Sequence, residues 1–96
     1  MSAAQEILNQ LGGNKFIAMT GAKHLADLGN GLQFRVGRNK EKVSSVVIEL
    51  GADDTYTVRY YKIRGVKIDL LKESKGVYCD QLRQDFETNT GLYTSL

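Results

Sequence analysis

The sequence predicts an α+β domain: an antiparallel sheet of about five strands with an N-terminal and a C-terminal helix packed on one face. Apolar residues recur at helical spacing near both ends, whereas apolar and polar residues alternate through the middle. Short turn-like segments separate the alternating stretches, which favours antiparallel pairing. With 96 residues, the chain is expected to form one domain, residues 1–96.

The first element is predicted to be a helix that ends at Gly12 and Gly13, because glycine readily adopts the left-handed conformation after a helix. Ser2 and Gln5 have the spacing of a capping box, in which each side chain bonds a backbone N–H of the first turn. Four apolar residues then share one face of this helix: Ala4, Ile7, Leu8 and Leu11.

Five segments are predicted as strands: Lys15–Thr20, Leu32–Val36, Val43–Leu50, Thr55–Ile63 and Val66–Leu71. The first is short and apolar enough to be buried on both faces. The turns between the later strands fall at 29–31, 51–54 and 64–65, where glycine, asparagine and aspartate are concentrated. Residues 21–28 fit either a short helical turn or a loop.

Alternation assigns the faces of these strands. One face is expected to face the helices, and it holds Leu32, Phe34, Val36, Val46, Ile48, Leu50, Tyr56, Val58, Tyr60, Val66, Ile68 and Leu70. The opposite face is expected to meet water, and it holds Gln33, Arg35, Thr57, Arg59, Tyr61, Lys67 and Asp69.

The last helix is predicted from about Val77 to Thr88, with an apolar stripe of Tyr78, Leu82 and Phe86. Cys79 lies beside this stripe and is expected to be a small buried residue. The uncharged tail 91–96 fits two interpretations: a strap over the domain's own core, or a segment that docks onto a partner.

Composition excludes several classes of protein. The chain is 42% hydrophobic and 25% charged, which argues against disorder, and it holds no apolar stretch of membrane-spanning length. No signal peptide pattern is present, and the single cysteine cannot form an internal disulfide, so we expect a cytoplasmic protein. A net charge of +2 does not by itself indicate nucleic-acid binding.

Residues for catalysis are nearly absent, so we expect no enzyme, no cofactor and no metal site. His24 and Cys79 are the only histidine and cysteine, and a nucleophilic pair of the two is the weakest hypothesis. The adjacent pair Asp53 and Asp54 is typical of a turn. Neither glycine stretch matches a phosphate-binding loop: Gly12 and Gly13 follow a helix rather than a strand, and Gly21 follows a predicted strand but has Phe16 where the first glycine of the loop is required.

Basic residues carry the main functional hypothesis. Four of them fall within eight residues at a strand end and its loop, and outward positions on neighbouring strands add two more cations and an aromatic ring. Cations beside an exposed ring suit a single-stranded nucleic acid, because cations neutralise phosphates and the ring stacks on a base. The predicted site is Arg35, Arg38, Lys40, Lys42, Arg59, Tyr61 and Lys67; the alternative is an ordinary solvated sheet face.

A second functional class is protein interaction, either self-association to a homo-oligomer or inhibition of another protein. Tyrosine is favoured in binding hot spots, so Tyr56, Tyr60 and Tyr61 and the uncharged tail would form that surface. The same tyrosines also fit strand positions with a packed ring and a hydrated hydroxyl.

Two segments, 15–23 (KFIAMTGAK) and 87–96 (ETNTGLYTSL), resemble small uncharacterised proteins of about this length encoded by tailed phages and bacterial mobile elements. The hairpin DTYT at 54–57 and the turn KIRG at 62–65 fit the same resemblance, which would cover nearly the whole chain. The resemblance implies an accessory phage protein, made in the cytoplasm of a bacterial host cell, that binds a nucleic acid or a host protein. It carries over no catalytic or binding residue.

Overall fold

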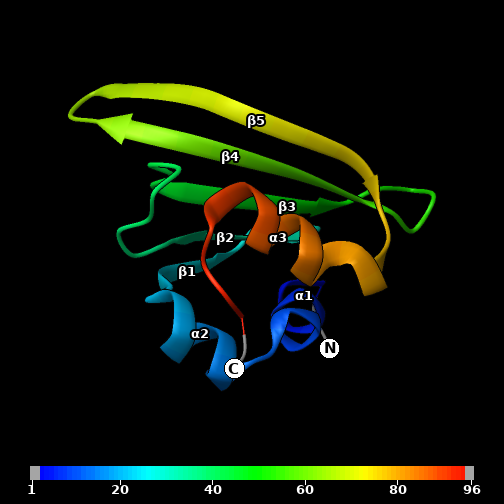
Figure 1. The fold of residues 1–96 in the computed structure, drawn as a ribbon. Helices are drawn as coiled ribbons and strands as arrows, with labels where there is room; N and C mark the ends of the chain where they lie inside the picture. The colour runs from blue at the N-terminus through cyan, green and yellow to red at the C-terminus, as the bar shows by residue number, and fades with distance from the viewer. Residues whose placement is uncertain (1–2, 95–96) are drawn as a thin grey trace.

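A computed structural model describes residues 3–94 of the chain. Two helices open it and one closes it, with five strands between (Figure 1). In chain order the elements are α1 (Ala3–Leu11), α2 (Asn14–Thr20), β1 (Lys23–Asp27), β2 (Gly31–Arg35), β3 (Ser45–Leu50), β4 (Tyr56–Arg64), β5 (Lys67–Val77), the 3-10 turn η1 (Cys79–Gln81) and α3 (Leu82–Thr90).

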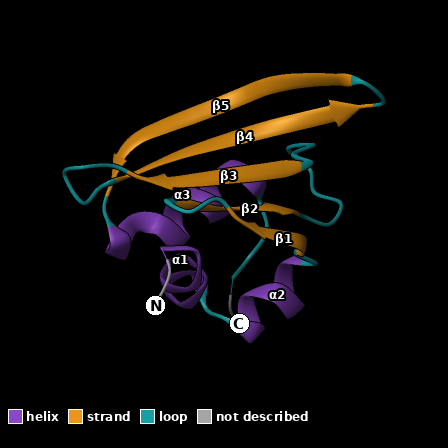
Figure 2. Cartoon of the chain, turned by 180° about the vertical axis from the view of Figure 1, so that it is seen from behind, coloured by secondary structure: helices purple, strands orange, loops and turns teal. Residues whose placement is uncertain are grey.

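The five strands form one antiparallel sheet in the order β1-β2-β3-β4-β5. All helices lie on the same face, and the opposite face carries none of the described elements (Figure 2). The predicted α+β class is therefore confirmed. Within residues 3–94, no helix is long and apolar enough to cross a membrane.

The core lies between the sheet and the helices and is joined by three aromatic rings. Phe16 of α2 contacts Phe34 of β2 and Phe86 of α3 edge-on, with ring centroids 5.3 and 5.2 Å apart. All three side chains are buried. Alternation in β2 to β4 follows the prediction, because Val46, Ile48, Tyr56, Val58 and Tyr60 are buried beneath the helices.

The prediction of a strand at Lys15–Thr20 is wrong, because these residues belong to α2. Only Phe16 and Thr20 are fully buried, one helical turn apart, and the Thr20 hydroxyl donates to the Phe16 carbonyl at 2.7 Å. Gly21 ends the helix in the left-handed conformation. An apolar run of six residues is too short to distinguish a helical repeat from strand alternation, which explains the error.

The fifth strand comes instead from the ambiguous stretch 21–28. β1 forms the edge of the sheet beside β2, and all five of its residues are exposed. His24 has a φ of 56°, and the pairing is irregular between Lys23 and Ala26. Since an exposed, distorted edge strand has no buried face, it shows no alternation in sequence.

β5 is longer than predicted, and its face assignment is wrong. Register irregularities occur twice along its pairing with β4, once between the partners of Tyr60 and Tyr61. Beyond that point Leu70 lies opposite Tyr61 and Ile68 opposite Ile63, which puts both on the bare face. Val66, Ile68 and Leu70 are 103%, 64% and 52% exposed. Lys67 and Asp69, predicted on the same face as Tyr61, pair with Arg64 and Lys62 and therefore lie on the other face of the sheet.

The C-terminal helix begins later than predicted, after the single turn η1. Leu82 and Phe86 are buried as expected, but Tyr78 is 58% exposed and Cys79 is exposed rather than buried. Both precede α3, so helical spacing does not apply to them. The proposed Ser2 cap lies outside the described residues.

The described part of the tail packs back onto α3. Thr94 is fully buried, and its backbone N–H and hydroxyl both donate to the Glu87 carboxylate at 2.8 and 2.9 Å. Leu92 packs against the core, whereas Tyr93 is exposed. Residues 92–94 therefore strap the domain's own core, and residues 95–96 lie outside the described range.

Candidate nucleic-acid interface

Charge is separated between the two ends of the sheet, although the net charge is small. Tyr61, Arg35 and Ser45 mark one end, and Tyr56, Leu50 and Asp27 the other. Eight of the 13 lysines and arginines lie at or beyond the first end: Lys23, Arg35, Arg38, Lys40, Lys42, Lys62, Arg64 and Lys67. The opposite end holds several carboxylates, including Glu6, Asp27, Asp53 and Asp54.

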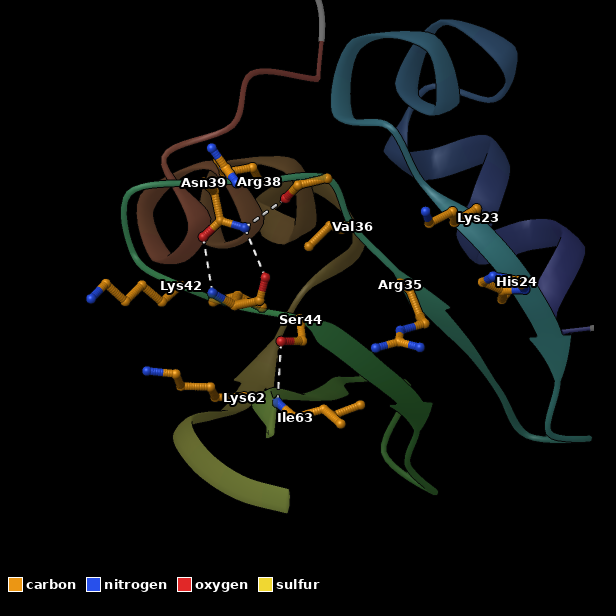
Figure 3. A pocket seen from close by; sticks show the side chains of 12 residues that line it. Lys23, His24, Arg35, Val36, Arg38, Asn39, Lys42, Ser44, Lys62 and Ile63 are labelled. Atoms are coloured by element: carbon orange, nitrogen blue, oxygen red, sulfur yellow. Dashed lines mark hydrogen bonds between the residues drawn. The ribbon is translucent and has the colours of Figure 1, made fainter. Parts of the chain in front are cut away.

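A cavity of about 530 Å³ opens at the basic end, between the start of β1, the loop 36–44 and the far part of β4 (Figure 3). We call it the basic pocket. No aspartate or glutamate of the described chain lines it. Six basic side chains do: Lys23, His24, Arg35, Arg38, Lys42 and Lys62. Such a site would attract anions, because no carboxylate among its described lining residues neutralises its cations.

The loop 36–44 owes its shape largely to Asn39. Its amide nitrogen donates to the carbonyls of Gly37 and Val43 at 2.9 and 2.8 Å, and its amide oxygen accepts from the Val43 N–H at 2.9 Å (Figure 3). The buried Val43 side chain anchors the loop in the core. Lys42 adopts a left-handed φ of 62°, which is uncommon for a lysine.

The loop is also fixed to the sheet. The Ser44 N–H donates to the Tyr61 carbonyl at 2.7 Å, and the Ser44 hydroxyl accepts from the Ile63 N–H at 3.1 Å. Since that hydroxyl serves as an acceptor here, its own proton is free to be donated to a ligand in the pocket.

The electrostatics of Lys62 show how concentrated the positive charge is. Desolvation lowers the pKa of Lys62, the nearby cations Arg64 and Lys42 lower it further, and the carboxylate of Asp69 partly opposes them. Because like charges disfavour one another, an anion bound among them would relieve this repulsion.

The bare sheet face adjoins the basic pocket. Arg35, Ser45 and Tyr61 are cross-strand partners in one row, so Arg35 and Tyr61 share this face. A smaller hollow of about 290 Å³ lies there, and we call it the apolar shelf. It is lined by Gln33, Ser45, Val47, Tyr61, Ile63 and Ile68, and Ile63 also lines the basic pocket.

Arg59 shares this face but does not join the basic pocket. Its guanidinium forms ion pairs with Glu49 and with Glu73, the latter at 2.7 Å, on the two flanking strands. Hydrogen bonds to these carboxylates raise the pKa of Arg59, and the bond from Arg59 lowers the pKa of Glu73. The charge of Arg59 is thus already neutralised, which alternation in sequence could not reveal.

The structure brings together Arg35, Arg38 and Lys42 of the predicted site and sets Tyr61 beside them. Lys40 lies in the same loop but outside the pocket, with its aliphatic stem against Gly91. Lys67 lies on the opposite face near the hairpin tip. The site predicted from the sequence did not include Lys23, His24 or Lys62.

Two other hypotheses find their residues elsewhere. His24 lies on edge strand β1 at the basic end, whereas Cys79 follows β5 at the opposite edge and end, so the two do not form a pair. Tyr56 and Tyr60 are buried, and their hydroxyls donate to Gln10 and Asp85 at 2.7 and 2.6 Å. Neither is available as an exposed docking residue.

Comparison of the chain with protein-family models, with curated proteins and with solved structures finds no match.

Proposed function

We propose that the protein is a non-enzymatic module that binds single-stranded nucleic acid at its basic end. The observation that carries the proposal is the composition of the basic pocket, in which five lysines and arginines and one histidine surround a cavity without a carboxylate. The polyanionic backbone of a nucleic acid is the abundant ligand that such a site suits.

In this proposal, the phosphates and the bases of the nucleic acid bind at two adjacent sites. Phosphate groups would enter the basic pocket, where the flexible cations neutralise them and the Ser44 hydroxyl donates a hydrogen bond. A base would lie on the apolar shelf against the ring of Tyr61, with Ile63 and Ile68 beside it. Base stacking on an aromatic ring contributes about 1–3 kcal/mol and needs a base free of its duplex partner.

The proposal includes a biological setting drawn from the resemblance to phage and mobile-element proteins: an accessory protein acting on nucleic acid in a bacterial cell. Residues 15–23, which contribute to the resemblance, form α2 and the start of β1 beside the pocket. One of the segments that carry the resemblance therefore lies next to the proposed site.

Binding can be tested by fluorescence anisotropy with labelled single strands of about 12 nucleotides, a length within typical site sizes. The double variant R38Q/K42Q should bind at least tenfold more weakly than the wild type. The matched control K72Q/K75Q removes the same charge from β5, where neither lysine lines the basic pocket, and should change affinity by less than about threefold. Equal losses in both variants, or no binding by the wild type, would refute the proposal.

A further inference from the structure

We propose that the tip of the β4–β5 hairpin enters the major groove of a DNA duplex that adjoins the bound single strand. The inference rests on the proposed function and specifies its ligand as a junction between double-stranded and single-stranded DNA. We call residues 62–69 the arm.

The arm extends beyond the rest of the sheet (Figures 1 and 2). β3 begins opposite Tyr61, and Ser44 makes the last described bond from the neighbouring loop, to Ile63. Beyond Tyr61, β4 and β5 continue to the pair of Arg64 with Lys67, which is about 10 Å at about 3.4 Å per residue, and only this last pair lies beyond the bond from Ser44. A major groove is about 12 Å wide and 8.5 Å deep, so it admits a two-stranded ribbon of this reach.

The charges of the arm fit the walls of a groove. Lys62, Arg64 and Lys67 lie on its face away from Tyr61, and Asp69, the partner of Lys62, is the only carboxylate of the arm. Lys62 also lines the basic pocket, so this lysine links the pocket to the other cations of the arm. A nucleic acid that crosses the pocket would therefore meet the arm next.

The tip itself is apolar. Val66 is 103% exposed in a turn between Arg64 and Lys67, where the domain gains nothing from a branched apolar side chain. At the floor of a major groove, the same side chain can contact the methyl group of thymine. A-form RNA has a deep, narrow major groove that side chains cannot read, so the arm favours DNA over RNA duplexes.

The test compares three labelled probes: a single strand of about 12 nucleotides, the same strand as an overhang on a DNA duplex of slightly more than one turn, and that overhang on an RNA duplex. Overhangs of both polarities are made. We expect the wild type to bind one tailed DNA duplex about tenfold more tightly than the strand alone, and the tailed RNA duplex no more tightly than the strand alone.

Variants then assign the gain to the arm. R64Q/K67Q should lose the duplex gain and keep binding to the single strand within about threefold, while K72Q/K75Q keeps both. Replacing duplex thymine by uracil should weaken the wild type about fourfold, as for one lost methyl contact, and leave V66S unaffected.

The outcomes separate the two proposals. Equal binding of the single strand and both tailed DNA duplexes overturns the arm's role and leaves the proposed function standing. Equal gains from DNA and RNA duplexes, or a duplex gain that survives R64Q/K67Q, also overturn it. Binding of none of the probes overturns the proposed function itself.

Discussion

The salt dependence of binding should fall when cations of the basic pocket are removed. On single strands, each neutralised phosphate contributes about 0.7 to the slope of log K against log salt. If the five lysines and arginines of the pocket each neutralise one phosphate, the slope is about −3.5. Between about 50 and 200 mM salt, the Kd of the wild type then rises about 130-fold.

The double variant R38Q/K42Q should reduce the slope to about −2.1, so that its Kd rises only about 20-fold over the same range. Anisotropy titrations at four or more salt concentrations measure both slopes, with K72Q/K75Q as the charge-matched control. The reasoning is refuted if the variant keeps the wild-type slope, or if the control flattens it equally.

Three further predictions concern the architecture of the site and core. N39A removes three hydrogen bonds from the loop and should lower the free energy of unfolding by about 1–3 kcal/mol in urea titrations. It should also lower nucleic-acid affinity, although no charge changes. Unchanged affinity would show that the shape of the loop does not matter for binding. K42G relieves a left-handed lysine and should raise the free energy of unfolding by about 1 kcal/mol while weakening binding; lower stability would contradict the strain. Y60F removes the hydrogen bond to Asp85 and should lower the free energy of unfolding by about 2 kcal/mol at pH 7. Burial and Asp85 raise the pKa of Tyr60, so its contribution is complete below the unfolded pKa of about 10 and is lost as the pH rises above it; urea titrations up to pH 11 should show a smaller alkaline loss in Y60F.

Alternation predicted the centre of the sheet correctly, because β2, β3 and β4 have one face under the helices and the other bare. The buried rows through Phe34, Val46 and Val58 therefore repeat every second residue. The edges were not predictable in this way. β1 has no buried residue, and a register irregularity in β5 turns Ile68 and Leu70 to the bare face.

The candidate site was predictable only where its residues are close in sequence. Arg35, Arg38 and Lys42 lie close together in one strand end and its loop, so their clustering in the sequence indicated them. Lys23 and Lys62 reach the same pocket through the pairing of β1 with β2 and through the bond between Ser44 and Ile63. Arg59 was included because its face was correct, but its partners Glu49 and Glu73 come from different strands.

The central claim, that nucleic acid binds in the basic pocket, is tested most directly by NMR titration of the labelled protein with an unlabelled single strand. Amide resonances of Lys42, Ser44 and Ile63 should shift first and saturably, while those of Asp53 and Asp54 at the acidic end stay in place. Shifts centred on the acidic end, or none at ligand excess and low salt, would contradict the account.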